Sequence, residues 1–379
     1  MRLLHSADWH LGRVLHGAPL IEDQAHALDQ LTAIAADTRP DAVIIAGDVY
    51  DRAVPPPEAV ELLDDTLARL VLGHKLLVIV IAGNHDSPRR LGFGARLLAH
   101  GGLHVFGPCQ ARPAPLILSD AHGPVAIHAL AHAEPAVVRA VLADEAPRDH
   151  DQAFAARLAD LAPAPAGARR VLAAHAFVAG GLESLSERPL SVGGSGAVAV
   201  ERFRGFDYVA LGHLHRPQQV SGVNARYAGS LLKYSFSEVD QPKSLSLVEL
   251  DAAGLAGVGA IAIEPLRDAR IIGGRLEELL ADPPATGRQD YLRVELQNIE
   301  PVIDAIGRLR AVYPNVLQVT RPHLATAPAQ GQIDPRRLDD AQIFAAFYRQ
   351  TTGQEATPAM LEAFAAEARQ LRRQEREAH

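Results

Sequence analysis

The chain has 379 residues, of which 48% are hydrophobic and 22% charged, and its formal net charge is −8. That length exceeds one ordinary domain and allows a sizeable core with one or two smaller units. An acidic chain has no global basic field to hold a polyanion, so any nucleic-acid binding must come from a local patch or from metal ions. Cys109 is the single cysteine, which excludes an internal disulfide and a thiolate zinc site and predicts a reducing, cytoplasmic compartment. The apolar runs fall far short of the ~20 residues that a membrane span needs, so no membrane association is expected.

The first hundred residues alternate between predicted strands and predicted helices. Apolar runs at 2–6, 42–46 and 76–82 predict buried strands. Helical spacing predicts a helix at 22–36 and a second one that the prolines at 55–57 open. This alternation is typical of an α/β unit with a parallel sheet.

The next 160 residues have shorter strand patterns. Segments at 103–106, 115–118 and 125–130, followed by helices near 134–143 and 153–161, predict a continuation of the first sheet with a cover helix. Strands at 171–174 and 207–211 flank a glycine-rich loop at about 178–200, which is either a substrate-facing flap or an ordinary surface loop. Alternating segments at 226–228, 244–250 and 258–263 predict a second sheet packed on the first.

From about 268 the pattern restarts as a small α+β unit, and a linker rich in Ala, Pro and Gln then leads to helices at about 339–351 and 358–376. The second helix has one apolar stripe, which indicates either docking on a partner or packing on its own core; the stripe is Leu361, Phe364, Ala368 and Leu371. We predict domains at 1–265, 266–325 and 326–379. The sequence has no GxxxxGK[ST] phosphate loop, so we expect no ATPase activity of its own.

Five apolar segments each end in side chains that bind metal ions. One histidine alone is usually solvated or merely packed, but a core gives no reason for the whole set. Oxygen and imidazole ligands without sulfur suit Mn²⁺, Mg²⁺ or Fe. Seven ligands are too many for one ion and suit two, with the carboxylate of Asp48 as the natural bridge. The candidate ligands are Asp8, His10, Asp48, Asn84, His175, His213 and His215.

The motifs DxH, GDxxD, GNHD, an isolated His and GHxH, in this order, resemble those of the calcineurin-like metallophosphoesterases. Within that superfamily the stretches 1–12, 208–215 and 229–238 resemble the bacterial SbcD family of nuclease subunits. The resemblance implies a four-layer αββα sandwich with a small α+β capping domain and C-terminal helices. It also implies one metal ion on Asp8, His10, Asp48 and His215, a second on Asp48, Asn84, His175 and His213, and a catalytic His85 that binds neither.

The same resemblance implies a function. A DNA nuclease with two Mn²⁺ ions is expected, with Mg²⁺ or Fe as alternatives, and it would act in replication, recombination and repair as a 3′ to 5′ double-strand exonuclease and a single-strand or hairpin endonuclease. His85 would protonate or position the leaving 3′ oxygen. The implied partners are DNA, an SbcC-type coiled-coil ATPase bound by the C-terminal segment, and a second copy of the chain, paired through helices at about 58–72 and 88–100 within a heterotetramer.

Several points stay open at this stage. Basic side chains close behind the metal motifs are candidate DNA contacts or plain solvated surface: Arg13, His16, Arg52, Arg89 and Arg90. Relatives often have a second active-site histidine where this chain has Asp51, so a substrate-positioning role is open there. A stand-alone phosphatase or phosphodiesterase would share every ligand but has no use for a capping domain and docking helices. A structural subunit with idle metals is disfavoured because all seven ligands are present.

Overall fold

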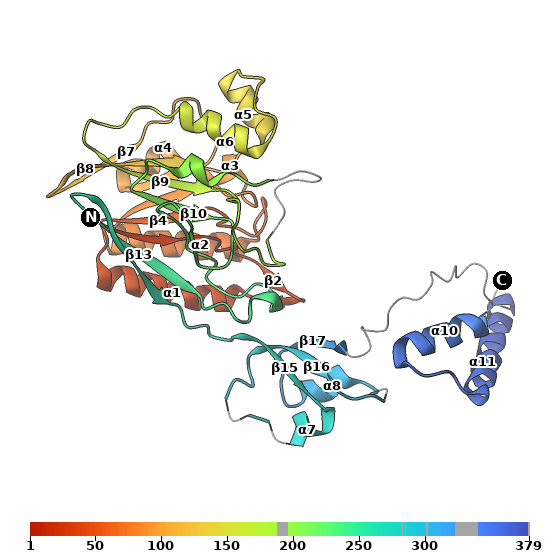
Figure 1. The fold of residues 1–379 in the computed structure, drawn as a ribbon. Helices are drawn as coiled ribbons and strands as arrows, with labels where there is room; N and C mark the ends of the chain where they lie inside the picture. Colours follow the sequence, from red (N-terminus) through yellow and green to blue (C-terminus); the bar gives the residue numbers. More distant parts are fainter. Residues whose placement is uncertain (188–195, 282, 285, 301, 323–339, 378–379) are drawn as a thin grey trace. The chain divides into compact units, whose positions relative to one another are not determined.

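The structure is a computed structural model that describes residues 1–187, 196–281, 283–284, 286–300, 302–322 and 340–377. The chain divides into two compact units, Met1–Ala269 and Arg270–His379. In the first unit two six-stranded sheets lie face to face, and helices cover both outer faces (Figure 1). This arrangement confirms the predicted four-layer αββα sandwich.

The first sheet contains the early βαβαβ alternation. Its core strand β4 is buried along its whole length because both faces of the sheet are covered, which explains why its sequence does not alternate. Strands β1, β4, β5 and β6 are parallel, and β13 and β14 extend the sheet with antiparallel pairing. In spatial order the strands are β14 (Gly254–Ala262), β13 (Ser244–Asp251), β1 (Arg2–Ser6), β4 (Ala42–Ala46), β5 (Leu77–Ile81) and β6 (Leu103–Phe106).

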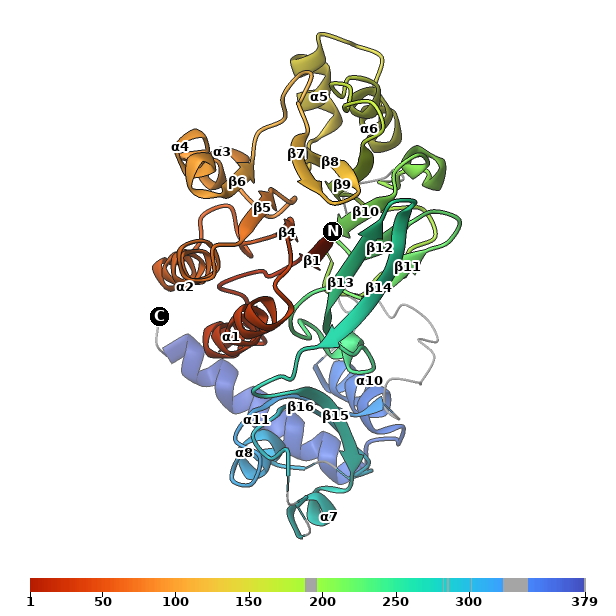
Figure 2. The same ribbon diagram turned by 90° about the vertical axis from the view of Figure 1, so that its left-hand side faces the viewer.

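The second sheet is formed by the middle of the chain. Four of its strands are parallel, and β7 and β11 close the two edges in antiparallel pairing. In Figure 2 β1, β4 and β5 of the first sheet are seen apart from β8, β9 and β10 of the second, and α1 and α2 lie beyond the first sheet. In spatial order the strands are β11 (Gln218–Val220), β12 (Ala225–Tyr227), β10 (Tyr208–Gly212), β9 (Arg169–His175), β8 (Gly123–Leu130) and β7 (Leu116–Asp120).

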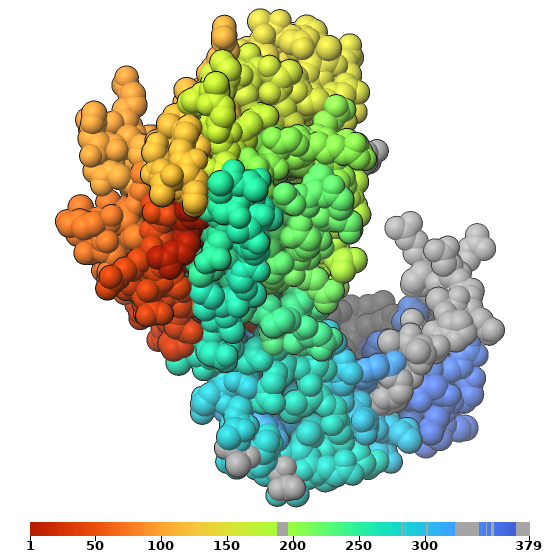
Figure 3. Space-filling model, turned by 60° about the vertical axis from the view of Figure 1, so that its left-hand side comes forward, coloured from red at the N-terminus to blue at the C-terminus, as the bar shows by residue number. Residues whose placement is uncertain are grey.

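Two sheet assignments made from the sequence are wrong. The segments at 244–250 and 258–263 join the first sheet, where β13 pairs with β1, and β7 and β8 open the second sheet instead of continuing the first. Figure 3 shows the β13–β14 hairpin in teal between the red N-terminal part and the green part of the second sheet. Periodicity identifies a half-buried strand, but it contains no information about the strand edge with which that strand pairs.

One apolar core lies between the sheets. Leu3, Ile44 and Ile79 project into it from the first sheet, and Val171 and Tyr208 project from the second. All five are fully buried, and each aliphatic side chain contributes roughly 1.5–3 kcal/mol relative to exposure. The two sheets therefore pack as one rigid body beneath the loops at their strand ends.

The helices begin and end where the sequence has the expected signals. For example, α1 has two acidic residues in its first turn and ends at Arg39, which is left-handed and precedes Pro40. The helix expected at 88–100 is interrupted by Gly92-Phe93-Gly94 and forms two short pieces instead. The helices of the first unit are α1 (Ile21–Thr38), α2 (Pro57–Ala68), α3 (Pro88–Leu91), α4 (Ala95–Leu98), α5 (Pro135–Leu142) and α6 (His150–Ala159), with a π-turn at Arg69–Gly73 and 3₁₀ turns at Ala99–Gly101, Val200–Phe203 and Phe236–Glu238. A small ribbon, β2 (Val14–Leu15) and β3 (Ala18–Pro19), precedes α1.

The second unit begins with a three-stranded sheet, β15 (Ala269–Gly274), β16 (Tyr291–Leu296) and β17 (Val316–Thr320), with α7 (Leu276–Ala281) and α8 (Ala305–Arg310). Its own small core includes Leu292, Leu309 and Tyr313.

Helices α10 (Asp340–Thr352) and α11 (Pro358–Glu377) pack on each other, with the Phe344 and Phe364 rings stacked at 4.4 Å. Most of the predicted linker and the side chain of Leu371 lie outside the described residues. Among the described helices, none is long and apolar enough to cross a membrane.

Candidate metal centre

The predicted ligands lie together at one end of the sandwich. Asp8 and His10 follow β1, Asp48 follows β4, and Asn84 follows β5, all in the first sheet. The other three come from the second sheet: His175 is the last residue of β9, and His213 and His215 follow β10. The site forms because the carboxyl ends of these parallel strands from both sheets meet at the same edge.

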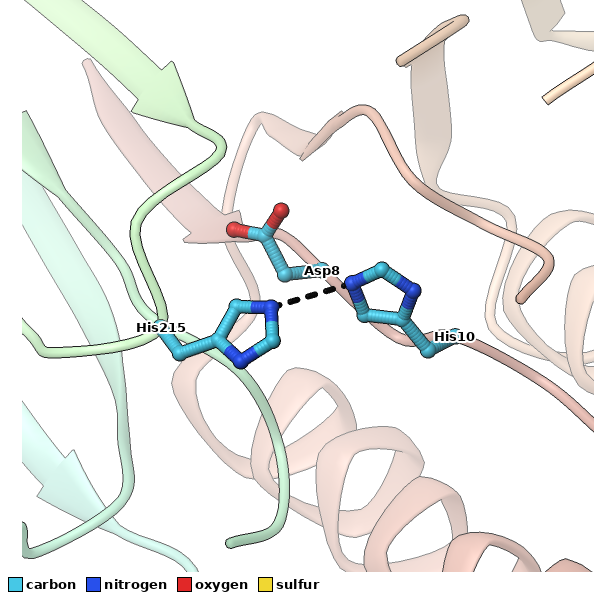
Figure 4. Close-up of side chains that lie close together, drawn as sticks. All are labelled: Asp8, His10 and His215. Atoms are coloured by element: carbon cyan, nitrogen blue, oxygen red, sulfur yellow. Dashed lines mark hydrogen bonds between the residues drawn. The ribbon is translucent and has the colours of Figure 1, made fainter. Parts of the chain in front are cut away.

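One group of ligand atoms comes from Asp8, His10 and His215, which lie within 4.8 Å of one another. The Nε2 atoms of the two histidines are 3.1 Å apart, and Figure 4 shows the two rings facing each other with Asp8 beside them. All three side chains are buried. These three donors could hold one metal ion.

A second group comes from Asp8, Asp48 and His175, again within 4.8 Å. Asn84 Oδ1 lies 2.9 Å from His175 Nε2 and 3.2 Å from His213 Nδ1, so this group extends to all the remaining predicted ligands. Asp48 Oδ2 lies 3.4 Å from His175 Nε2 and 3.7 Å from His10 Nε2. That carboxylate therefore stands between the two groups, as a bridging ligand must.

The backbone is strained where it delivers these side chains. Asp8, His10 and Asp48 have φ values of 52°, 45° and 48°, in the left-handed region. Such residues cost of order 1–3 kcal/mol each and persist only where the surrounding structure over-determines them. His213, which follows β10 of the second sheet, also has a positive φ, 112°. The candidate ligand loops of both sheets thus hold their side chains against a local conformational preference.

Two glycines allow the loops to approach one another. A Cβ at Gly83 would lie 2.1 Å from Asp48 Oδ1, and a Cβ at Gly212 would lie 1.9 Å from the Ala46 carbonyl oxygen. Any side chain at these positions would push the loops apart. The glycines beside the ligands thus set the spacing between the strand ends of the two sheets.

The electrostatics fit divalent cations. Burial, together with the negative charge of Asp48, raises the pKa of Asp8 well above its usual value. Burial also lowers the pKa values of His10 and His213, which keeps them in the neutral form that binds metals. Burial lowers the pKa of His175, but the nearby Asp48 outweighs it and raises that pKa to about 9.

His85 lies beside this centre and belongs to neither of the two groups. Its Nδ1 lies 2.8 Å from the Asp51 carbonyl oxygen, and its backbone N–H donates to Asp48 Oδ1 at 2.8 Å. Its ring meets that of His10 edge to face at 4.7 Å. His85, His10 and Asp51 also have ligand atoms within 4.8 Å, but the Asp51 carboxylate is already paired with Arg13 at 2.8 Å.

The five candidate DNA contacts lie at different depths. The side chain of Arg13 is 18% exposed and that of Arg52 is 73% exposed, and both point toward Asp51. His16 is exposed and stacks on Phe236. Arg89 and Arg90 are exposed at the start of α3. In the glycine-rich loop, the segment 188–195 lies outside the described residues.

Sequence reasoning missed residues that hold the site without belonging to a ligand set. Asp86 accepts the N–H groups of Val49, Tyr50 and Gly83 and so fastens the loop after β4 to the loop after β5. Burial raises the pKa of this carboxyl to about 6. Its place in the GNHD motif was the only available signal, because its partners are backbone groups that no sequence pattern reveals.

Glu238 and Lys243 were missed for a similar reason. Both are buried behind His215, with Glu238 Oε2 2.6 Å from Lys243 Nζ. Burial alone would raise the pKa of Glu238, but the hydrogen bond from His215 and the charge of Lys243 hold it at about 2. Two charged residues five positions apart look like ordinary solvated surface in a sequence.

The sandwich, the loops at its strand ends and the convergent ligands define a calcineurin-like phosphoesterase. The family model with that description matches residues 1–217, and the model of the Type 5 capsule protein repressor C-terminal domain matches residues 265–352. The D subunit of the nuclease SbcCD from Staphylococcus epidermidis is 32% identical over 356 residues, which cover 93% of this chain and 94% of that protein. The chain belongs to the SbcD family of phosphodiester-hydrolysing nucleases, with a site for two divalent metal ions.

Two solved structures were compared as well. TT1561 of Thermus thermophilus is 12% identical, with a TM-score of 0.37, and the match covers 69% of this chain and 99% of that one. A dimetal phosphatase from Danio rerio is 12% identical, with a TM-score of 0.35 and coverage of 70% and 99%. The family assignment depends on the sequence matches and not on these two structures.

Proposed function

We propose that this chain is the Mn²⁺-dependent nuclease subunit of an SbcCD-type complex, cutting double-stranded DNA from 3′ ends and single strands and hairpins internally. The observation that supports it is the convergence of seven oxygen and imidazole donors from five strand ends on one buried centre. Those donors suit Mn²⁺, and they disfavour a structural zinc site because no thiolate is among them.

In this proposal the two metal positions share one carboxylate. Asp8, His10 and His215 form the first position, Asn84, His175 and His213 form the second, and Asp48 belongs to both. Two divalent ions bound at these positions would supply positive charge beside the phosphoryl group and lower the pKa of a bound water molecule. The distances from Asp48 to His10 and to His175 support the shared role.

His85 is the proposed catalytic residue. Its Nδ1–H donates to the Asp51 carbonyl oxygen, which leaves Nε2 to face the substrate. From there it protonates or positions the leaving 3′ oxygen. Asp51 holds Arg13 through its carboxylate and His85 through its carbonyl, so the chain uses this residue to order two neighbours. Arg13, His16, Arg52, Arg89 and Arg90 are the proposed phosphate contacts.

The remaining parts of the chain serve assembly in this proposal. Residues 266–325 cap the nuclease domain 1–265, and 326–379 bind the coiled-coil ATPase of the complex in the cytoplasm. The relative from Staphylococcus epidermidis is named as one subunit of SbcCD, which supports the proposal that this chain has a partner chain. A second copy would pair through α2 to α4, where Phe93 and Leu97 are 83% and 79% exposed.

A substrate comparison tests the proposal. Purified protein with Mn²⁺ should cut a plasmid hairpin and shorten linear duplex DNA when the ATPase partner and ATP are present, and EDTA should abolish both reactions. A small phosphodiester such as bis-p-nitrophenyl phosphate should be a poor substrate. If the small diester were hydrolysed efficiently while the DNA stayed uncut, the chain would instead be a stand-alone phosphodiesterase.

A further inference from the structure

Glu238 is a fully buried carboxylate directly behind the metal centre. It ends the 3₁₀ turn Phe236–Glu238, and its side chain is 0% exposed. One oxygen, Oε1, lies 3.2 Å from His215 Nδ1 and accepts a hydrogen bond from the Ser186 hydroxyl. The other, Oε2, lies 2.6 Å from Lys243 Nζ. A buried charge needs such partners, so the environment of Glu238 is built for an ionised carboxylate.

His215 is held at three separate points. Its backbone N–H donates to Glu187 Oε1 at 2.7 Å, and its carbonyl oxygen accepts from Lys243 Nζ at 2.9 Å. Its ring Nδ1 lies 2.9 Å from Ser186 Oγ and 3.2 Å from Glu238 Oε1. Backbone and ring are thus fixed together, and Lys243 contacts both His215 and Glu238.

The chemistry of these contacts determines which ring nitrogen carries the proton. An ionised carboxylate only accepts hydrogen bonds, so the proton of a neutral His215 ring lies on Nδ1. The lone pair is then on Nε2, which faces His10 Nε2 at 3.1 Å (Figure 4) and belongs to the group of Asp8, His10 and His215. His175, in the other group, has a neutral partner at Nδ1, the Ala46 carbonyl oxygen at 2.9 Å.

We propose that Glu238, anchored by Lys243, is a positioning residue that fixes the ring and tautomer of His215 and so strengthens metal binding at the position of Asp8, His10 and His215. A carboxylate partner makes an imidazole a more basic ligand than a carbonyl partner does. This inference rests on the ligand assignment of the proposed function, in which His215 binds one of two ions.

Metal titration of the full chain tests it without an activity assay. In isothermal titration calorimetry with Mn²⁺, Glu238→Gln should weaken one of the two binding events by about 10- to 100-fold and leave the other unchanged. Glu249→Gln is the matched control, because it makes the same chemical change at an exposed position on β13 and should titrate like the parent. Parent-like affinity in Glu238→Gln would overturn the proposal.

A spectroscopic readout separates positioning from a general structural role. In the metal-free protein, long-range ¹H–¹⁵N spectra should show His215 as a single tautomer protonated at Nδ1, and Glu238→Gln should give a mixture of both tautomers. Glu238→Gln also leaves the Lys243 ammonium buried without its anion. The double variant with Lys243→Met removes both charges, should fold like the parent, and should keep the weakened metal position. Restored affinity in the double variant would show that charge balance, and not positioning, was responsible.

The variant His215→Ala distinguishes a failure of the ligand assignment from a failure of the proposed role of Glu238. It should lose one Mn²⁺ ion completely. If His215→Ala bound two ions like the parent, the ligand assignment itself would be wrong. If it lost one ion while Glu238→Gln and the double variant behaved like the parent, the metal centre would stand and the role of Glu238 would be disproved.

Discussion

At the scale of single residues, the proposal assigns metal binding and catalysis to two neighbours in the loop after β5. Asn84 and His85 are neighbours whose side chains cannot take the same coordination position, and the structure directs Asn84 Oδ1 at His175 and His213 while His85 turns to the Asp51 carbonyl. His85→Gln should therefore keep two Mn²⁺ ions and DNA binding but cut about 10²- to 10⁴-fold more slowly, because a proton donor is lost. Calorimetry for metal and a nuclease assay for rate check this directly.

The control for His85→Gln is a variant of a proposed ligand, Asp48, which accepts a hydrogen bond from the His85 backbone N–H. Asp48→Asn weakens the carboxylate that lies near both metal groups, so metal and cleavage should be lost together. Loss of a metal ion in His85→Gln, or cleavage at the parent rate, would show that His85 is not the catalytic residue outside the ligand set.

At the scale of elements, the ion pair of Asp120 and Arg169 and its hydrogen bonds connect four strand ends. Asp120 at the end of β7 accepts from Arg169 at the start of β9, and Arg169 also donates to the carbonyl oxygens of Gly123 and Asp251. The hydrogen bonds from Arg169 and the N-terminal amine hold the pKa of Asp120 well below its usual value. We expect Asp120→Asn to lower the free energy of unfolding by about 1–2 kcal/mol at pH 7.

The pH dependence of that loss follows from the direction of the shift. Because the folded-state pKa is depressed, the stabilisation is fully present above the unfolded pKa of about 4 and is lost progressively as pH falls from there through the folded-state pKa. Urea titrations of the parent and Asp120→Asn should therefore differ most at pH 7, and the difference should shrink steadily as pH falls below about 4. Asp37→Asn, at an exposed position on α1, should match the parent throughout. A constant difference at all pH values would exclude the ion pair as the cause.

At the scale of the whole molecule, the C-terminal helices are separable from the metal centre. α10 and α11 pack on each other through Phe344 and Phe364, and every described ligand of the centre lies in the first unit. A chain that ends at Pro335 should stay folded, bind two Mn²⁺ ions and fail to co-purify with the ATPase partner. Unchanged co-purification would mean that the partner docks elsewhere.

Self-association is the second prediction at this scale. Around α2 to α4, Val60, Phe93 and Leu97 are exposed beside an apolar cavity of about 340 Å³ that Leu63 and Leu91 line. Sedimentation at micromolar concentration should detect a dimer, and Phe93→Asp with Leu97→Asp should shift it to monomer. Ile117→Asp, an exposed apolar position on β7, serves as the control and should leave the dimer intact.

The sequence alone predicted which candidate ligands lie together, because side-chain chemistry and strand-end position are both local properties. Asp8, Asp48 and Asn84 follow apolar runs that can only be buried strands, and carboxyl ends of such strands meet. The αββα class followed from the resemblance in those motifs. A continuous helix was expected at 88–100. The break between α3 and α4 lies at Gly92 to Gly94, which is a local signal in the sequence.

Only the tertiary structure decided the pairing of strands and the support behind the ligands. β13 joins β1 across more than 240 residues of chain, a choice made by the free edge of β1 and not by any pattern within β13. Asp86 and Glu238 act through backbone groups and a lysine that folding brings to them. A sequence encodes which side chains can bind a metal, but the orientation of those side chains depends on contacts that exist only after the sheets have packed.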